Sequence, residues 1–112
     1  MPVPLYRSTA EFFRALGHPV RIRLLELLSE RDQAVHELRE AINIEASSLS
    51  HQLAVLRQHG LVNQHREGGE VMYSIALPEV RDLLQVARSI LVTRSVDRTE
   101  FVDEVSRESV GG

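Results

Sequence analysis

A short run of polar side chains between Ser47 and Gln52 has the composition of a surface that hydrogen-bonds to nucleic-acid bases. A helix from about Ala46 to His59 would turn the leucines at positions 49, 53 and 56 toward the core, because successive residues are rotated by about 100°. The side chains that then face outward or to the flanks are small, polar and uncharged: Ser47, Ser48, Ser50, His51 and Gln52. Such a face fits the major groove of double-stranded DNA. An ordinary solvated helix has a similar face, so the neighbouring elements decide between the two interpretations.

A second short helix precedes this one. Val35, Leu38 and Ile42 recur at helical spacing and mark one apolar face. Residues 43–45 interrupt the pattern before the next helix begins. Two short helices joined by a tight turn are typical of a helix-turn-helix unit, whose second helix enters the major groove. The free amides at the N-terminus of that second helix add phosphate-binding capacity.

The apolar period then changes from helical to alternating. Odd-numbered residues from Val71 to Ile75 are apolar or aromatic and share one face of a predicted strand. The segment Asn63–Arg66 can pair with this strand across the glycines at positions 68 and 69, which are a hairpin signal. A hairpin directly after a helix-turn-helix unit is a wing. At this place His65 and Arg66 would reach a minor groove or a phosphate.

Three further helices are predicted around this unit. The first begins at the capping-box pattern Ser8–Glu11 and is stopped by Gly17. The second, at 20–28, is apolar on most sides and should be buried, and a polar connector at 29–33 follows it. The last begins near Pro78 and has one wholly apolar face. The predicted fold class is mainly α with a β-hairpin wing, a winged helix-turn-helix of four helices, two strands and a fifth helix.

The first and last helices carry more apolar surface than the core of a 112-residue chain needs. This surplus predicts a homodimer with a helical interface, in which the same surface of both copies is buried. The residues assigned to that interface are Leu5, Phe12, Phe13, Leu83, Leu84, Ala87, Ile90 and Leu91.

The net charge of −3 comes from the end of the chain. Residues 1–94 carry 11 arginines and 11 acidic residues, whereas residues 95–112 carry two arginines and five acidic residues. We therefore expect a domain at 1–94 for DNA binding and dimerisation, followed at 95–112 by an acidic tail that is weakly helical or disordered. The lack of cysteine excludes disulfides and thiolate sites. No apolar run reaches the roughly 18 residues of a membrane span, so a cytoplasmic location is expected.

Several segments together have a recognisable pattern. Leu16–Leu24 contains Gly-His-Pro, Ser47–Leu56 contains Ser-x-x-Ser-His-Gln-Leu, and Gly60–Val62 and Gly69–Tyr73 frame the wing. They resemble the ArsR/SmtB family of bacterial repressors over about residues 9–92, most specifically in the Ser-x-x-Ser-His-Gln-Leu block. The resemblance implies a dimer built on the first and last helices, with two recognition helices reading an inverted-repeat operator. It makes Ser47, Ser50 and His51 the foremost candidates for DNA contact.

Many members of this family release DNA when a metal ion binds, but the usual ligands are missing here. The third-helix site, Cys-Val-Cys in its best-known form, reads Ala34-Val35-His36. The matching positions of the last-helix site read Leu77, Glu79, Ile90 and Thr93. Each family site therefore retains one ligand at most, and neither is intact.

A metal site of another kind stays open. The weak candidates are His36 and Glu40, four residues apart on one helix, and the acidic pair Glu79 and Asp82. Imidazole and carboxylate suit divalent zinc, nickel or cobalt, but chance pairs are expected in a chain with five histidines. A signal brought by a separate sensor protein, or no ligand at all, is an equal alternative. No cofactor is certain.

Two other functions compete with that of a DNA-binding transcriptional regulator. Catalysis by Ser50 and His51 is disfavoured because neighbours on a helix point about 100° apart, and no glycine-rich phosphate loop is present, so we expect no enzyme. The alternative is a winged-helix module that binds proteins without specific DNA binding, which the acidic balance favours. Salt dependence discriminates them, since DNA affinity falls steeply as salt rises.

Overall fold

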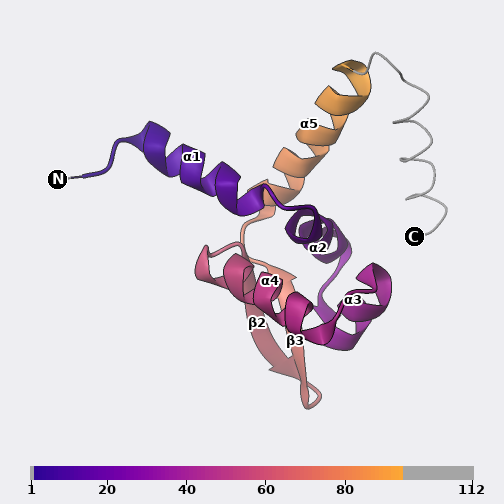
Figure 1. The fold of residues 1–112 in the computed structure, drawn as a ribbon. Helices are drawn as coiled ribbons and strands as arrows, with labels where there is room; N and C mark the ends of the chain where they lie inside the picture. Colours follow the sequence, from indigo (N-terminus) through magenta and orange to yellow (C-terminus); the bar gives the residue numbers. More distant parts are fainter. Residues whose placement is uncertain (1, 95–112) are drawn as a thin grey trace. The chain divides into compact units, whose positions relative to one another are not determined.

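Five helices and three strands follow one another in residues 2–94, the part of the chain that the computed structural model describes (Figure 1). They are α1 Leu5–Leu16, α2 Pro19–Glu30, β1 Gln33–Ala34, α3 Val35–Ile42, α4 Ala46–Gln58, β2 Val62–Glu67, β3 Glu70–Ile75 and α5 Pro78–Arg94. The chain divides into two compact units, Met1–Arg81 and Asp82–Gly112. The first holds α1 to β3 and the first turn of α5. The acidic tail predicted at 95–112 lies outside the described residues.

Leucine side chains of α2, α3 and α4 form the core of the first unit. Helix α2 packs against α3, α4 and β3, and α4 packs against β2. The largest fully buried side chains are Leu24, Leu25, Leu28, Leu38, Leu49, Leu53, Leu56, Leu61 and Val62. Because the leucines of α2 and of α4 recur every three or four residues, they form the apolar stripe that a surface helix turns inward. The predicted burial of residues 49, 53 and 56 is confirmed.

Helix α1 begins three residues before the predicted capping box. The prediction of a start at Ser8 is wrong, because Pro4 is the N-cap residue, with φ −58° and ψ 144°. Its carbonyl oxygen accepts hydrogen bonds from the amides of Arg7 and Ser8. The fixed φ of proline suits the residue before a first turn. Thr9 uses its hydroxyl inside the helix instead, where Oγ1 donates to the carbonyl oxygen of Leu5 at 2.9 Å.

The segment 29–33 is not the plain polar connector that the sequence predicts. Helix α2 continues through Glu30, and β1 begins at Gln33. Strand β1 is antiparallel to β3, with Gln33 opposite Tyr73 and Ala34 opposite Met72. The sheet order is therefore β1-β3-β2, with β3 in the centre. Through this pairing, β1 joins the wing to the segment that directly precedes α3.

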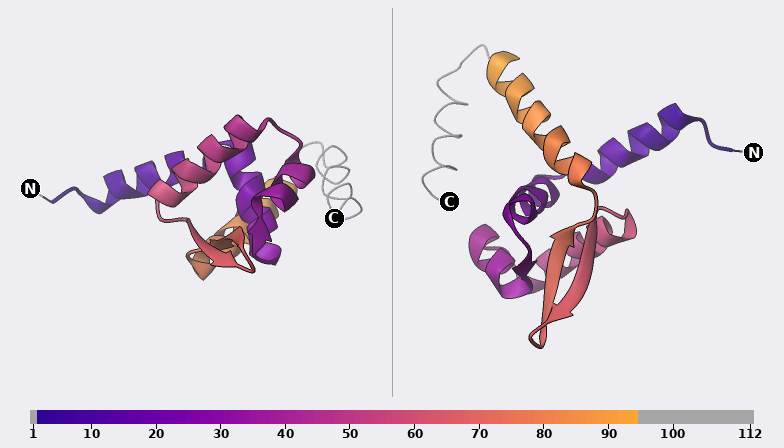
Figure 2. Two further views of the ribbon diagram at one scale, coloured as in Figure 1. Left: turned by 90° about the horizontal axis from the view of Figure 1, so that it is seen from below. Right: turned by 180° about the vertical axis from the view of Figure 1, so that it is seen from behind.

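The wing is the hairpin of β2 and β3. Its register runs from Val62 opposite Ile75 to Glu67 opposite Glu70, so Gly68 and Gly69 alone make the turn. Their φ values are +59° and +84°, the sign that a type I′ turn needs at both central residues. The predicted glycine hairpin is confirmed, and its tip projects beyond α3 and α4 (Figure 2).

Helix α1 reaches away from the other elements of the first unit and meets them at its last turn (Figures 1 and 2). Ala15 and Leu16 are buried there, whereas Leu5 is 81% exposed. At the start of α5, Val80 is buried and Arg81 Nε donates to the carbonyl oxygen of Ser29 at 2.8 Å. None of the helices in residues 2–94 has the length and hydropathy needed to cross a membrane.

Candidate nucleic-acid interface

The turn between α3 and α4 sets the direction of the predicted reading helix. Asn43 ends α3 in the left-handed conformation, with φ +60°, and its amide donates to the carbonyl oxygen of Arg39 at 2.8 Å. Asparagine tolerates this conformation better than most residues. Glu45 is extended and its carbonyl oxygen accepts the first helical bond of α4, from the amide of Leu49. The buried leucines then fix which face of α4 is outward.

In the first half of α4, the residues that the sequence predicts to face outward are exposed. Ser47, Ser48, Ser50 and His51 are all exposed, over the buried side chain of Leu49. The residues from Ala46 to Gln52 include no aspartate, glutamate, lysine or arginine. The exposed side chains therefore offer short hydrogen-bonding groups at a helix N-terminus, where free amides also attract anions.

Gln52 differs from the other predicted contacts. It is half-buried, and its Oε1 accepts a hydrogen bond from Arg21 Nη1 at 3.0 Å. Its Nε2 lies 3.5 Å from Nε2 of His18. The amide is thus engaged inside the chain, next to α2. Arg21 and His18 were not selected by the sequence reasoning, although both lie in the Leu16–Leu24 segment that carries the family resemblance.

The two predicted wing residues are exposed and also have partners within the chain. His65 Nε2 lies 3.6 Å from Glu67 Oε2 and 3.8 Å from Asp32 Oδ2. Arg66 Nη1 donates to the carbonyl oxygen of Gly69 at 3.2 Å. Arg66 therefore lies along the wing turn, and His65 faces two carboxylates. These are surface contacts, which an exposed side chain exchanges readily for another partner.

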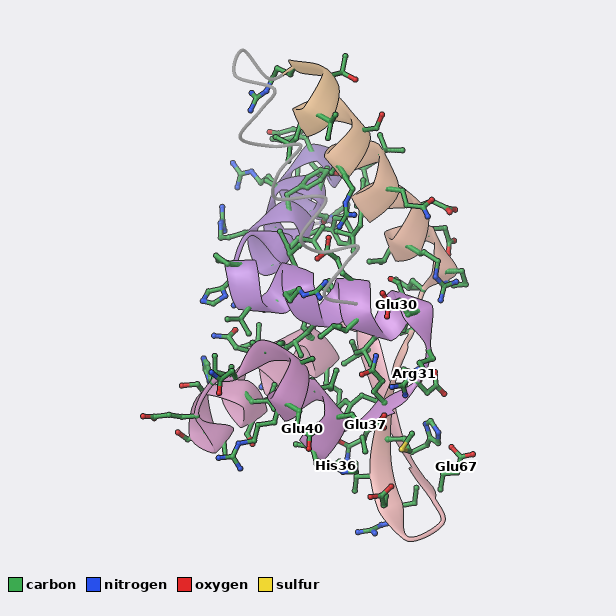
Figure 3. The ribbon with its side chains drawn as sticks, turned by 90° about the vertical axis from the view of Figure 1, so that its right-hand side faces the viewer. Glu30, Arg31, His36, Glu37, Glu40 and Glu67 are labelled. Atoms are coloured by element: carbon green, nitrogen blue, oxygen red, sulfur yellow. The ribbon has the colours of Figure 1, made fainter. Side chains whose placement is uncertain are left out.

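The metal-ligand candidates do not gather. His36 Nδ1 lies 3.5 Å from Glu70 Oε1 on the wing. His36 and Glu40 are both exposed on α3 (Figure 3), and Glu79 and Asp82 are exposed on α5. Within residues 2–94 there is no group of three histidine, aspartate or glutamate side chains that could hold a metal ion.

One carboxyl of α3 has a shifted pKa. The main-chain amide of Ala34, which donates to Glu37 Oε1 at 3.0 Å, lowers the pKa of Glu37. The guanidinium of Arg31 lowers it further, since Arg31 Nη1 is 2.8 Å from Glu37 Oε2 (Figure 3). Both donors favour the charged carboxylate. This ion pair links the segment before β1 to the first turn of α3.

The residues assigned to a dimer interface are mostly accessible in the single chain. On α1, Leu5 is 81% and Phe13 52% exposed, and Phe12 packs edge-on against Phe13 with ring centroids 5.6 Å apart. On α5, Ile90 is 56% and Leu91 42% exposed, and Ala87 is exposed, whereas Leu83 and Leu84 are half-buried. Large exposed apolar side chains are typical of interaction surfaces, and the assignment of these residues to a dimer interface stays a prediction.

Comparison with known proteins links this arrangement to bacterial regulators. Residues 18–64 match the family described as "Bacterial regulatory protein, arsR family". The HTH-type transcriptional regulator Rv0081 of Mycobacterium tuberculosis is 48% identical over 103 residues, which are 91% of this chain and 90% of that protein. The transcriptional repressor SmtB homolog of Synechocystis is 42% identical over 77 residues, 69% of this chain and 58% of that protein.

Solved structures have the same fold. The crystal structure of M. tuberculosis Rv0081 aligns with a TM-score of 0.78 and 49% identity, covering 88% of this chain and 99% of that one. The solution structure of a homodimeric winged helix-turn-helix DNA-binding domain from Mycobacterium bovis aligns with a TM-score of 0.70 and 28% identity, covering 82% of this chain and 88% of that one.

Proposed function

The chain belongs to the ArsR/SmtB family of DNA-binding transcriptional regulators, and on that premise we propose that it binds an inverted-repeat operator as a homodimer, with the first half of α4 in the major groove. Relatives of this kind are regulators and not enzymes. The family resemblance and the homodimeric neighbour from M. bovis support the dimeric state.

The observation that carries the proposal is the exposed face of α4. Ser47, Ser48, Ser50 and His51 are exposed and polar, and the leucines beneath them are fully buried. In this role Ser50 and His51 bond base edges, and Ser47 and Ser48 bond the phosphate next to the helix N-terminus. Gln52 stands apart from these contacts, because its half-buried side-chain amide is engaged with Arg21.

The wing makes the second contact. Arg66 and His65 are exposed on β2, and in the proposed complex they leave their partners within the chain to bind backbone phosphates or a minor groove. Such contacts set the orientation of a protein on the duplex but specify little sequence. We therefore assign affinity to the wing and base discrimination to α4.

The symmetry of the DNA site follows from the symmetry of the dimer. A two-fold dimer presents two copies of α4, and recognition helices of this kind contact half-sites about 10 base pairs apart, or multiples of that distance. The exposed apolar residues of α1 and of α5 are the surfaces that we assign to the dimer, each on its own helix. An inverted repeat is the operator that such a pair reads.

The proposal is tested with the DNA upstream of the chain's own gene. In a gel-shift titration, His51→Ala and Ser50→Ala should each weaken specific binding by about 1–3 kcal/mol, the cost of losing a base contact. Affinity for unrelated DNA and the sedimentation of the dimer should stay unchanged. The matched control is His59→Ala, which removes an exposed histidine at the other end of the same helix.

Two outcomes would contradict this assignment. If both variants bind the operator as tightly as the unchanged protein, the first half of α4 is not the reading face. If binding to DNA is weak and independent of salt, the chain is instead the protein-binding winged-helix module considered above, because phosphate contacts make DNA affinity fall with salt.

A second proposal concerns whether a metal ion releases the protein from DNA. Metal response, directly or through a separate sensor protein, is tested by titrating the operator complex with nickel, zinc and cobalt salts. Release of DNA at one metal ion per chain would support a direct response through His36, Glu40, Glu79 or Asp82. Release only in the presence of cell extract would support a partner protein.

A further inference from the structure

The guanidinium of Arg21 connects three helices of the first unit. Arg21 lies in the first turn of α2. Its Nε donates to the carbonyl oxygen of Ala15 at 2.6 Å, and its Nη2 donates to that of Arg14 at 3.3 Å. The third donor, Nη1, bonds Oε1 of Gln52 on α4 at 3.0 Å. One side chain of α2 therefore bonds both the last turn of α1 and the middle of α4.

The carbonyl group of Ala15 on α1 needs a partner, whereas that of Arg14 already accepts from the amide of Gly17 at 3.2 Å. The last carbonyl groups of a helix have no amide four residues ahead within the helix, and the negative end of the helix dipole attracts a cation there. Ala15 is in the last turn of α1 and is itself buried. A planar fork with several fixed donors satisfies such carbonyls and an amide oxygen together, which the single ammonium group of lysine cannot do.

Apart from the bonds of Arg21, the connection between α1 and α2 is short and is held by hydrogen bonds to neighbouring residues. Only Gly17 and His18 separate the two helices. Gly17 donates to the carbonyl oxygens of Phe13 and Arg14, while His18 Nδ1 accepts from the amide of Val20 at the start of α2. None of these bonds reaches α4. In residues 2–94 the hydrogen bonds of Arg21 join α1 to α4, and His18 adds a 3.5 Å contact from its Nε2 to Nε2 of Gln52.

We propose that Arg21 is a positioning residue that fixes α4 relative to α1, and that it thereby restricts the dimer to operators of one half-site spacing. The inference rests on the proposed function, in which α1 contributes to the dimer and α4 reads DNA. Under that arrangement, the distance between two copies of α4 depends on how rigidly each is held to its own α1. Gln52 acts here as the anchor of Arg21 on the reading helix, not as a base contact.

The test uses the full chain and a series of operators in which one or two base pairs are added or removed between the half-sites. The unchanged protein should prefer one spacing. Arg21→Lys keeps the positive charge but loses the three-way fork, so its affinity for the preferred spacing should fall about tenfold, and its preference among spacings should flatten. The dimer dissociation constant and the salt dependence should not change, because no phosphate contact is lost.

Gln52→Ala provides a second variant, which breaks the bond from Arg21 to α4 together with the 3.5 Å contact to His18 and leaves the bonds of Arg21 to α1 in place. It too should flatten the spacing preference, and it should add little further loss in the Arg21→Lys background, because both changes break the same contact. His51→Ala is the control: it should weaken binding at every spacing by the same factor. Gln52→Ala also tests the inference if Arg21→Lys does not fold.

Several results would overturn the inference without touching the proposed function. Equal spacing preferences in the unchanged protein, Arg21→Lys and Gln52→Ala would do so, as would fully additive losses in the double variant. Arg21 would be a direct phosphate contact if Arg21→Lys bound normally and Arg21→Ala lowered the slope of log affinity against log salt by about 0.9. Failure of the unchanged protein to bind any operator would instead refute the proposed function itself.

Discussion

The side-chain amide of Gln33 donates a 2.7 Å hydrogen bond to the carbonyl oxygen of Leu27. Leu27 lies in the last turn of α2, which ends at Glu30, so its carbonyl has no helical amide four residues ahead. Gln33 is only 4% exposed and is the buried polar residue of the core. It therefore ends α2 with its side chain and pairs with Tyr73 of β3 through its backbone.

Replacing this glutamine should destabilise the protein. Gln33→Leu leaves the carbonyl oxygen of Leu27 without its donor in a buried place, which costs about 1–3 kcal/mol. Urea unfolding followed by circular dichroism measures the loss. Gln58→Leu, at the exposed end of α4, is the control and should change stability by less than about 0.5 kcal/mol. Equal unfolding midpoints for the two variants would show that the bond contributes nothing.

The stability of the chain should depend on pH through Glu37. The amide of Ala34, and then Arg31, lower the pKa of Glu37 below its ordinary value of 4.5. A carboxyl whose pKa is lower in the folded state stabilises the fold above the unfolded value, and this contribution is lost as pH falls through the folded value. Unfolding free energy should therefore decrease as pH drops below about 4.5.

The variant Glu37→Gln isolates this contribution. Its unfolding free energy should fall less steeply than that of the unchanged protein over the same acidic window, because glutamine does not titrate. Glu40→Gln removes one negative charge from an exposed place on the same helix and is the matched control. Parallel pH curves for the unchanged protein and Glu37→Gln would contradict the prediction.

Periodic and local signals account for the parts of the fold that the sequence predicted. The leucines of α4 recur at helical spacing, and this repeat alone fixes which face is buried. Gly68 and Gly69 signal a tight hairpin because each takes a positive φ at no steric cost. Such signals depend on neighbours within a few residues, so the sequence contains them in full.

The strand that the sequence does not predict depends on a distant partner, and the start of α1 depends on a local alternative to the capping pattern. Strand β1 has two residues, too few to show alternation, and it exists because β3 offers a free edge about 40 positions later. The start of α1 was misplaced because Ser8 has a capping pattern, yet Pro4 already supplies a suitable backbone. A serine or threonine near the start of a helix can cap it or can bond a carbonyl oxygen within it, so the capping pattern alone does not fix the first residue.

Gln52 shows why the site was predicted only in part. A helical projection places it on the flank of the outward face, where it can turn either to solvent or to the body of the protein. Arg21, which lies 31 positions earlier, decides the direction by bonding Oε1. Position on the helix therefore predicted the fully outward residues such as His51, but not the engagement of a flanking amide.

The two wing glycines should differ in their tolerance to substitution. Asparagine is favoured at the first central residue of a type I′ turn, with glycine at the second. Gly68→Asn should therefore leave stability nearly unchanged. Gly69→Val places a β-branched residue at φ +84°, which costs about 1–3 kcal/mol. Amide hydrogen exchange of β2 and β3 should show faster opening of the wing in Gly69→Val and not in Gly68→Asn.

The wing prediction has a functional readout as well. Gly69→Val should weaken binding to operator and to unrelated DNA by a similar factor, because phosphate contacts contribute to both. A loss confined to the operator would show that the wing discriminates bases, and it would contradict the division of roles between the wing and α4 that we propose.

Phe13 should be a principal contact of the dimer. It is 52% exposed on α1 although it is a large aromatic side chain, and burying such a side chain contributes about 1.5–3 kcal/mol. Phe13→Glu removes that contribution from both copies and buries a charge instead. Its dimer dissociation constant should rise by at least about 100-fold, as measured by sedimentation equilibrium, while circular dichroism stays that of a folded chain.

The control for this variant adds the same charge on the opposite side of α1. Ser8 is exposed and is turned by about 140° from Phe13 around the helix, and a glutamate near a helix N-terminus is favourable. Ser8→Glu should remain a dimer and bind operator normally. If Phe13→Glu also remains a dimer at micromolar concentration, α1 is not part of the interface. The spacing preference assigned to Arg21 would then need another origin, because α1 would no longer connect the two reading helices.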